Sequence, residues 1–330
     1  MHNKNNIVSR RLMGFAVLLT LSVILLGAWT RLSDAGLGCP DWPTCYGHFT
    51  VPTSADDLAR AAELYPGQAV VPEKAWPEMI HRHFAKAIGL VILVFAILAW
   101  RARGQGHHPR KQAYLMLAFV IFQGLLGMWT VTLKLHPAVV MAHLLGGFTT
   151  FALCFLAWLR LRGAAPVKSP ARLRVLAGLA LALLVAQIAL GGWTSANYAA
   201  VVCGRDLPVC QEGWRDRLNF DEGFSLPAND HATYEFGVKS MEARTAIHVT
   251  HRFGAALTAC LVALLALGLW QRRPTRALAG LLGGLLLLQL GLGIANVHFL
   301  LPLPVAVAHN GGAALLLLAL VAVNYRLRRA

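Results

Sequence analysis

The segment PEMIHRHFAKAIGLVILVFAILAW, residues 77–100, changes within a few positions from polar to apolar. It carries one carboxylate, two imidazoles and one guanidinium between Glu78 and His83, and it then becomes apolar up to Trp100. A helix needs roughly 20 apolar residues to cross a hydrocarbon core of about 30 Å. The segment therefore predicts a membrane-spanning helix with ionisable side chains gathered at one end.

Seven further windows of the chain have a similar length and composition. Of the 330 residues, 57% are hydrophobic and 14% are charged, which is typical of integral membrane proteins. We therefore expect an all-α integral membrane protein with eight transmembrane helices. The predicted spans cover about residues 12–30, 78–100, 112–132, 138–159, 173–194, 245–270, 277–297 and 303–325.

Lys and Arg are distributed unevenly over the connections between these spans. One set of connections holds 18 Lys or Arg, whereas all 15 acidic residues lie in the opposite loops and at the span entrances. By the positive-inside rule, this predicts a multi-pass protein of the cell membrane with both termini cytoplasmic. We attribute the net charge of +15 to topology and to contact with anionic membrane lipid, and we expect no nucleic-acid binding. The basic connections are segments 1–11, 101–111, 160–174, 271–276 and 326–329.

The chain contains an internal repeat. GAWTRLSDAGLGCPDWPTC (27–45) aligns with GGWTSANYAAVVCGRDLPVC (191–210), and the register continues downstream at offsets of 164 to 170 residues. This predicts two tandem four-helix bundles, residues 1–165 and 166–330, related by a pseudo-twofold axis along the membrane normal. Because the first span has a counterpart deep in the chain, we interpret it as retained and not as a cleaved signal peptide. The downstream matches are Ile80-His81-Arg82 with Thr250-His251-Arg252, Gln123 and Gly127 with Gln289 and Gly293, and Ala142-His143 with Ala308-His309.

Each half repeats one histidine on its second span and one on its fourth, so His81 pairs with His143 and His251 with His309. The predicted topology puts all four at one depth, near the non-cytoplasmic ends of their helices. Ionisable residues within spans usually mark a site, although histidines also hydrogen-bond between transmembrane helices. Two imidazoles on facing helices favour a haem iron over zinc, which takes four ligands in a small shell.

An arginine follows the first histidine of each half. Arg82 and Arg252 are candidates for binding haem propionates, with snorkelling to the membrane interface as the alternative. One helical turn before these histidines the halves differ, because Glu78 stands where the second half has His248. This asymmetry predicts a chemical role for Glu78, as a base or as a group that stabilises a developing cation. Alternatively, Glu78 lies in the first turn of a helix that begins at Pro77.

Four cysteines lie in the two long outer loops, Cys39 with Cys45 and Cys203 with Cys210. Outside the cytoplasm we expect a disulfide in each loop. A structural staple is the simpler interpretation of the second pair. A redox role stays open for the first pair, which belongs to the half that contains Glu78.

Together these features resemble the haem A synthase family. The resemblance rests on GLGCPDWPTC (36–45), EMIHR (78–82), MAH (141–143), THR (250–252) and VAH (307–309), and it covers nearly the whole chain. It implies that one methyl group of haem O is oxidised to a formyl group, giving haem A for cytochrome oxidase.

The resemblance also implies residue roles. His81 and His143 would be the axial ligands of the substrate haem O, His251 and His309 those of a haem b cofactor, and Glu78 the essential acid. Candidate partners are haem O synthase, an electron donor and further copies of the chain. The alternative is a bis-histidine membrane cytochrome b that only transfers electrons, and the difference between Glu78 and His248 argues against it.

Overall fold

The computed structural model describes residues 2–102, 108–163, 165–207, 210, 212–228 and 231–328. Within these ranges the chain is helical apart from its loops, and eight of its helices are long and apolar enough to cross a membrane. This confirms the predicted fold class. The eight are α1 (His2–Leu32), α3 (Pro72–Arg101), α4 (Arg110–Thr132), α5 (Pro137–Arg162), α6 (Ala171–Ala196), α8 (Met241–Trp270), α9 (Arg276–His298) and α10 (Leu303–Leu327).

The spanning helices run further than most of the predicted windows. The extra turns lie at the polar ends, since backbone hydrogen bonding continues into the interfacial regions, which bring the bilayer to about 40–45 Å. The start of α3 changes one interpretation. It begins at Pro72 with Glu73 in its first turn, and Pro77 lies inside the helix. The alternative that Glu78 merely occupies a first turn is therefore wrong.

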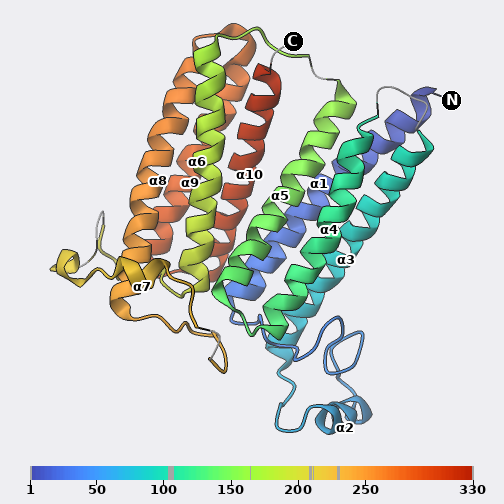
Figure 1. The fold of residues 1–330 in the computed structure, drawn as a ribbon, viewed down its shortest axis with the longest axis vertical. Coiled ribbons are helices and arrows are strands. Elements are labelled where there is room, and N and C mark those ends of the chain that lie inside the picture. Colours follow the sequence, from blue (N-terminus) through green and yellow to red (C-terminus); the bar gives the residue numbers. More distant parts are fainter. Residues whose placement is uncertain are drawn as a thin grey trace.

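Shorter helices occur in the two long loops. These are α2 (Ala55–Leu64), the 3-10 turn η1 (Trp214–Arg217) and α7 (Phe220–Phe224), and a further 3-10 turn, η2 (Arg273–Thr275), precedes α9. Ser54 caps α2 by accepting a hydrogen bond from the backbone N–H of Asp57. Both chain ends lie at one end of the molecule, and α2 and α7 lie at the other (Figure 1).

The spanning helices form two groups that follow the order of the chain. Helices α1, α3, α4 and α5 pack together, and α6, α8, α9 and α10 form the second group (Figure 1). Helix α10 joins them, because it packs on α6 and α9 of its own half and on α1 and α5 of the other. Its buried face is lined by small and aliphatic residues such as Gly311, Ala314 and Leu320. The boundary at residues 165 and 166 stays a prediction.

Three of the polar contacts between the halves join residues that are equivalent in the repeat. Arg31 Nη2 donates to the carbonyl of Ser195 at 2.5 Å, and the Tyr198 hydroxyl donates to Asp34 Oδ1 at 3.1 Å. Both pairs are 164 residues apart, which is the offset between Trp29 and Trp193. At the opposite ends of the helices, the hydroxyl of Tyr325 contacts the carbonyl of Leu159 at 3.3 Å. Contacts between equivalent residues favour the predicted pseudo-twofold relation, since such residues meet only near the axis.

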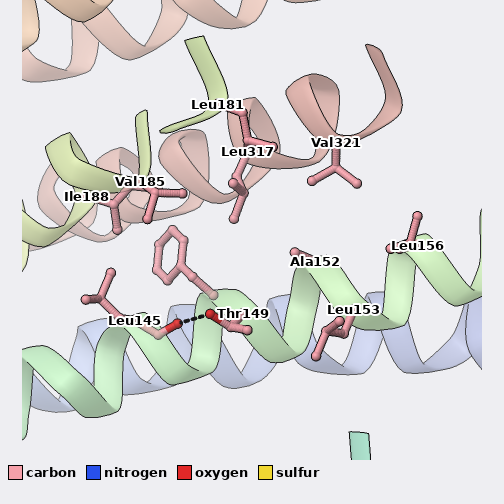
Figure 2. Close-up of a pocket in the computed structure, with 11 residues that line it drawn as sticks. Leu145, Thr149, Ala152, Leu153, Leu156, Leu181, Val185, Ile188, Leu317 and Val321 are labelled. Atoms are coloured by element: carbon pink, nitrogen blue, oxygen red, sulfur yellow. Dashed lines mark hydrogen bonds between the residues drawn. The ribbon is translucent and has the colours of Figure 1, made fainter. Parts of the chain in front are cut away.

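Between these polar ends the halves meet through apolar side chains. A pocket of about 210 Å³ lies between α5, α6 and α10 (Figure 2). Its one hydroxyl, that of Thr149, donates to the carbonyl of Leu145 in its own helix at 2.8 Å. The pocket therefore offers only apolar contacts. It is lined by Leu145, Phe148, Thr149, Ala152, Leu153, Leu156, Leu181, Val185, Ile188, Leu317 and Val321.

Candidate functional site

The four repeated histidines lie on α3, α5, α8 and α10. In the first half, the ring centroids of His81 and His143 are 6.3 Å apart, and the ring planes are inclined by 82°. Metal–nitrogen bonds of about 2.0–2.1 Å would place two opposite nitrogen ligands roughly 4 Å apart. Because the centre of each ring lies beyond its nitrogen, the observed spacing suits one metal ion between the rings. The pair fits the two axial positions of a haem iron.

A glycine of the neighbouring helix packs against each histidine ring. A Cβ added at Gly27 would lie 2.8 Å from Cε1 of His81, and one added at Gly127 would lie 3.2 Å from Cε1 of His143. Any larger residue would displace the ring, so the glycines set how closely the helices approach. In the second half the contacts are Gly191 with His251 at 3.2 Å and Gly293 with His309 at 3.3 Å.

We expect Gly27→Ala to weaken haem binding in the first half, because the new methyl group would overlap the His81 ring. The haem retained per purified protein, separated by chromatography, measures the effect. Gly178→Ala on α6 is the matched control, since an added Cβ there meets nothing within 4 Å. Equal retention in both variants would show that the close approach does not place His81.

A cavity of about 740 Å³ lies beside the first histidine pair, within the usual size range of ligand sites. Most of its wall comes from α1, α3, α4 and α5, and Glu78 is part of that wall. The second half contributes as well, through Gly192 of α6 and Asn310 of α10, the residue after His309. A ligand in this cavity would therefore contact both halves of the molecule.

Glu78 is buried, with only 4% of its surface exposed. Its Oε1 accepts a hydrogen bond from Arg82 Nη2 at 2.6 Å, and its Oε2 accepts one from the backbone N–H of Cys39 at 2.9 Å. Arg82 also donates through Nη1 to the carbonyls of Asp41, at 2.8 Å, and Thr44, at 2.6 Å. Glu78 is thus held from two sides, by its own helix and by the cysteine loop.

The equivalent position in the second half carries an imidazole. His248 is buried, and its Nδ1 lies 2.7 Å from the carbonyl of Ala199. Arg252 donates through Nη1 to the carbonyl of Asp206 at 2.7 Å. One half therefore presents a carboxylate to its cavity where the other half has a histidine bound to backbone.

The role of Arg82 and Arg252 as propionate ligands stays a prediction. Both terminal nitrogens of Arg82 already donate to Glu78 or to the cysteine loop. A propionate would have to share or replace one of these bonds. The contacts of Arg82 instead assign it a direct part in holding Glu78.

Both expected disulfides are present in the structure. The Cα atoms of Cys39 and Cys45 are 4.8 Å apart, and those of Cys203 and Cys210 are 4.6 Å apart. The first disulfide is connected to the candidate acid, because the N–H of Cys39 donates to Glu78. The second packs against Val249.

Three glutamines complete the surroundings of the histidines. Two of them, Gln123 and Gln289, align in the repeat, but the sequence by itself did not indicate a role for them. Their common offset of 166 residues, shared with the histidines they touch, was an available signal. Gln187 aligns with Val23 and gave no such signal. The side-chain nitrogen of Gln123 lies 3.2 Å from Nδ1 of His143, and that of Gln187 lies 3.0 Å from Nδ1 of His251. The side-chain nitrogen of Gln289 lies 3.3 Å from Nε2 of His309.

The fold and the site define a multi-span membrane protein in which His81 and His143 face each other beside a buried carboxylate, and in which His251 and His309 occupy the equivalent positions of the second half. Residues 10–321 match the COX15-CtaA family, described as cytochrome oxidase assembly protein. The chain belongs to this family.

Curated relatives agree with this assignment. The chain is 50% identical over 317 residues to the haem A synthase of Shewanella oneidensis, with 95% of each chain covered. It is 29% identical to the haem A synthase of Maricaulis maris, over 99% of this chain and 98% of the relative. It is 28% identical to that of Mesorhizobium japonicum, over 94% and 88%. The predicted resemblance to the haem A synthase family is confirmed.

Proposed function

We propose that the protein is a haem A synthase, an oxidoreductase that converts a methyl group of haem O to the formyl group of haem A. The observation that carries the proposal is the difference between the halves. A buried carboxylate, Glu78, faces a cavity beside His81 and His143, and the equivalent His248 of the other half is bound to backbone. An electron-transfer cytochrome has no need of such a carboxylate.

The first half is the better candidate for the substrate site. Trp29, at its outer end, is 45% exposed, whereas the equivalent Trp193 is 6% exposed. Trp193 is covered by α7, since its Nε1 donates to the carbonyl of Gly223 at 2.9 Å. A substrate must enter and leave, and a resident cofactor does not. We therefore assign haem O to His81 and His143, and haem b to His251 and His309.

When bound, haem O supplies the methyl group to be oxidised, and haem b supplies a redox-active iron. The protein residues supply position and charge. Glu78 accepts a proton from the reacting carbon or stabilises positive charge that develops beside it. Arg82 donates a hydrogen bond to one carboxylate oxygen of Glu78, and the N–H of Cys39 donates to the other. The two bonds fix the orientation of the carboxylate toward the cavity.

The charge pattern supports a proposed orientation. Both chain ends lie at one end of the molecule (Figure 1), and the described parts of the basic connections lie on that side. We place this end in the cytoplasm, with the cysteine loops outside. Haem O synthase, an electron donor and a second copy of the chain are the proposed partners.

The decisive experiment is haem analysis of protein purified from cells that also make haem O. We expect haem A together with haem b in the extract, separated by chromatography with mass detection. Haem b as the sole haem, with haem O present in the same membranes, would instead identify an electron-transfer cytochrome.

We expect the double substitution Cys39→Ser and Cys45→Ser to lower haem A formation by at least about tenfold. A tenfold loss corresponds to an increase of roughly 1.4 kcal/mol in the activation free energy. Without the disulfide, the loop that donates the Cys39 N–H to Glu78 is no longer closed. The matched control is Cys203→Ser with Cys210→Ser, in the loop that lies away from Glu78. Equal losses would show that both disulfides act only as structural staples.

A further inference from the structure

The cavity beside His81 carries more positive than negative charge. Of the charged residues that the structure describes, four line this cavity: the cations Arg31, Arg82 and Lys86, and the anion Glu78. Glu78 and Arg82 balance each other, because they form an ion pair at 2.6 Å. Ionisable side chains within membrane spans are costly and usually mark a site. The charge of Arg31 and Lys86 therefore favours an anionic ligand in the cavity.

Arg31 lies on the face of α1 that touches the histidine site. It follows Gly27 by one helical turn, and a Cβ added at Gly27 would lie 2.8 Å from the His81 ring. Only 16% of the Arg31 side chain is exposed. Its Nη2 donates to the carbonyl of Ser195, whereas its Nη1 lies 3.7 Å from Asp34 Oδ1, which is longer than a hydrogen bond. Nη1 is therefore able to donate to a ligand.

Lys86 lies one turn after Arg82 on α3, inside the predicted span 78–100. Its side chain is exposed and lines the cavity. Nζ contacts the carbonyl of Pro43 at 3.4 Å, so the amino group extends toward the cysteine loop. Within the part of the chain that the structure describes, Lys86 forms no ion pair. Its charge is thus unbalanced at the wall of the cavity.

The second half has neither of these cations. The repeat places Ser195 at the position of Arg31 and Ala256 at the position of Lys86. Both cations therefore belong to the half that we assign to the substrate, together with Glu78. A general need of the fold for positive charge at these positions would have kept it in both halves.

The side chains of haem O suit this charge. Every haem carries two propionates on one edge of its ring, and both are carboxylates at neutral pH. Guanidinium and ammonium groups bind carboxylates through charge-assisted hydrogen bonds. Arg31 and Lys86 both lie toward the loop end of the cavity, the first by its place on α1 and the second through its contact with Pro43. They are therefore placed to meet the same edge of a haem.

We infer that Arg31 and Lys86 bind the propionates of the substrate haem and orient its ring between His81 and His143. This inference rests on the proposed function. Axial ligands alone leave a haem free to turn about the line that joins them. Propionates held at the loop end prevent this rotation, so the same methyl group faces Glu78 in every turnover.

The first test compares haem O with its dimethyl ester, in which both propionates are uncharged. Protein purified from cells that make haem b but no haem O is titrated with each compound, and binding to the histidines is followed by absorption spectroscopy. A hydrogen bond between charged groups contributes roughly 10- to 100-fold in affinity. We expect wild-type protein to bind haem O at least about tenfold more tightly than the ester. Equal affinities would overturn the inference.

The second test removes each cation in turn. We expect Lys86→Met and Arg31→Gln each to weaken the binding of haem O by at least about tenfold and to leave the binding of the ester unchanged. Lys86→Arg keeps the charge and should keep the preference for haem O. A purely structural role would weaken the binding of both compounds equally, because packing does not depend on the charge of the ligand.

Lys74→Met is the matched control, because Lys74 is a cation of the same helix that is absent from the cavity wall. The haem b retained by each variant reports its folding. If Arg31→Gln loses haem b, the ester comparison in the wild type and the Lys86 variants decide. An unchanged preference for haem O in both Lys86→Met and Arg31→Gln would assign the propionates to Arg82 and overturn the inference.

The outcomes separate this inference from the proposed function. If the wild type binds haem O in preference to the ester and never forms haem A, the proposed function fails and the two cations keep their assignment as carboxylate ligands. If the wild type forms haem A and binds both compounds equally, the inference fails and the function stands.

Discussion

Glu78→Gln is expected to lower haem A formation by at least about 100-fold and to let haem O accumulate in the protein. The amide keeps the size of the carboxylate and its contact with the Cys39 N–H, but it cannot accept a proton or balance a developing positive charge. Removal of a positioned acid or base typically costs 10² to 10⁴ in rate. Haem b should remain bound, because its proposed ligands, His251 and His309, lie in the other half.

The choice of glutamine matters because Glu78 also forms a buried ion pair with Arg82, at 2.6 Å. Glu78→Ala would leave the guanidinium buried without its partner, which costs about 3–5 kcal/mol and confuses chemistry with folding. Glu73→Gln is the matched control, because Glu73 is exposed in the first turn of the same helix. Extracted haems are compared in all three proteins. Normal haem A formation by Glu78→Gln would contradict the catalytic role, and loss of haem b in that variant would assign Glu78 to structure.

His251→Ala and His309→Ala are each expected to remove haem b from the purified protein. Each variant deletes one of the two proposed axial ligands. The neighbouring Gln187 and Gln289 contact the histidine rings, so neither glutamine is expected to replace a lost ligand. The measurement is the reduced-minus-oxidised absorption spectrum together with the haem b extracted per protein.

His298→Ala is the control for these variants, since His298 is exposed at the end of α9. It should keep the full content of haem b. A b-type spectrum of wild-type intensity in either His251→Ala or His309→Ala would rule out that histidine as a ligand. Loss of haem O binding alone would move the cofactor to the first half and the substrate to the second.

The eight spans and the candidate ligands follow from the sequence by itself. Apolar runs of about 20 residues leave a chain few alternatives, because a backbone in a hydrocarbon core must satisfy its hydrogen bonds within a helix. The repeat then singled out four histidines among 13, and the difference between Glu78 and His248 marked one half as different. Each of these signals is local, or recurs at a fixed offset, and needs no knowledge of packing.

Only the tertiary structure decided what these side chains touch. The contact of Glu78 with Cys39 joins residues that lie 39 positions apart, and the cavity at Glu78 extends to Asn310 of the other half. The contact of Gln187 with His251 joins residues 64 positions apart, and the repeat has Val23 at the position of Gln187. Composition and periodicity set which face of a helix is apolar. Which side chain of one helix meets which of another depends on how closely the helices approach, and here glycines such as Gly27 and Gly254 set that distance.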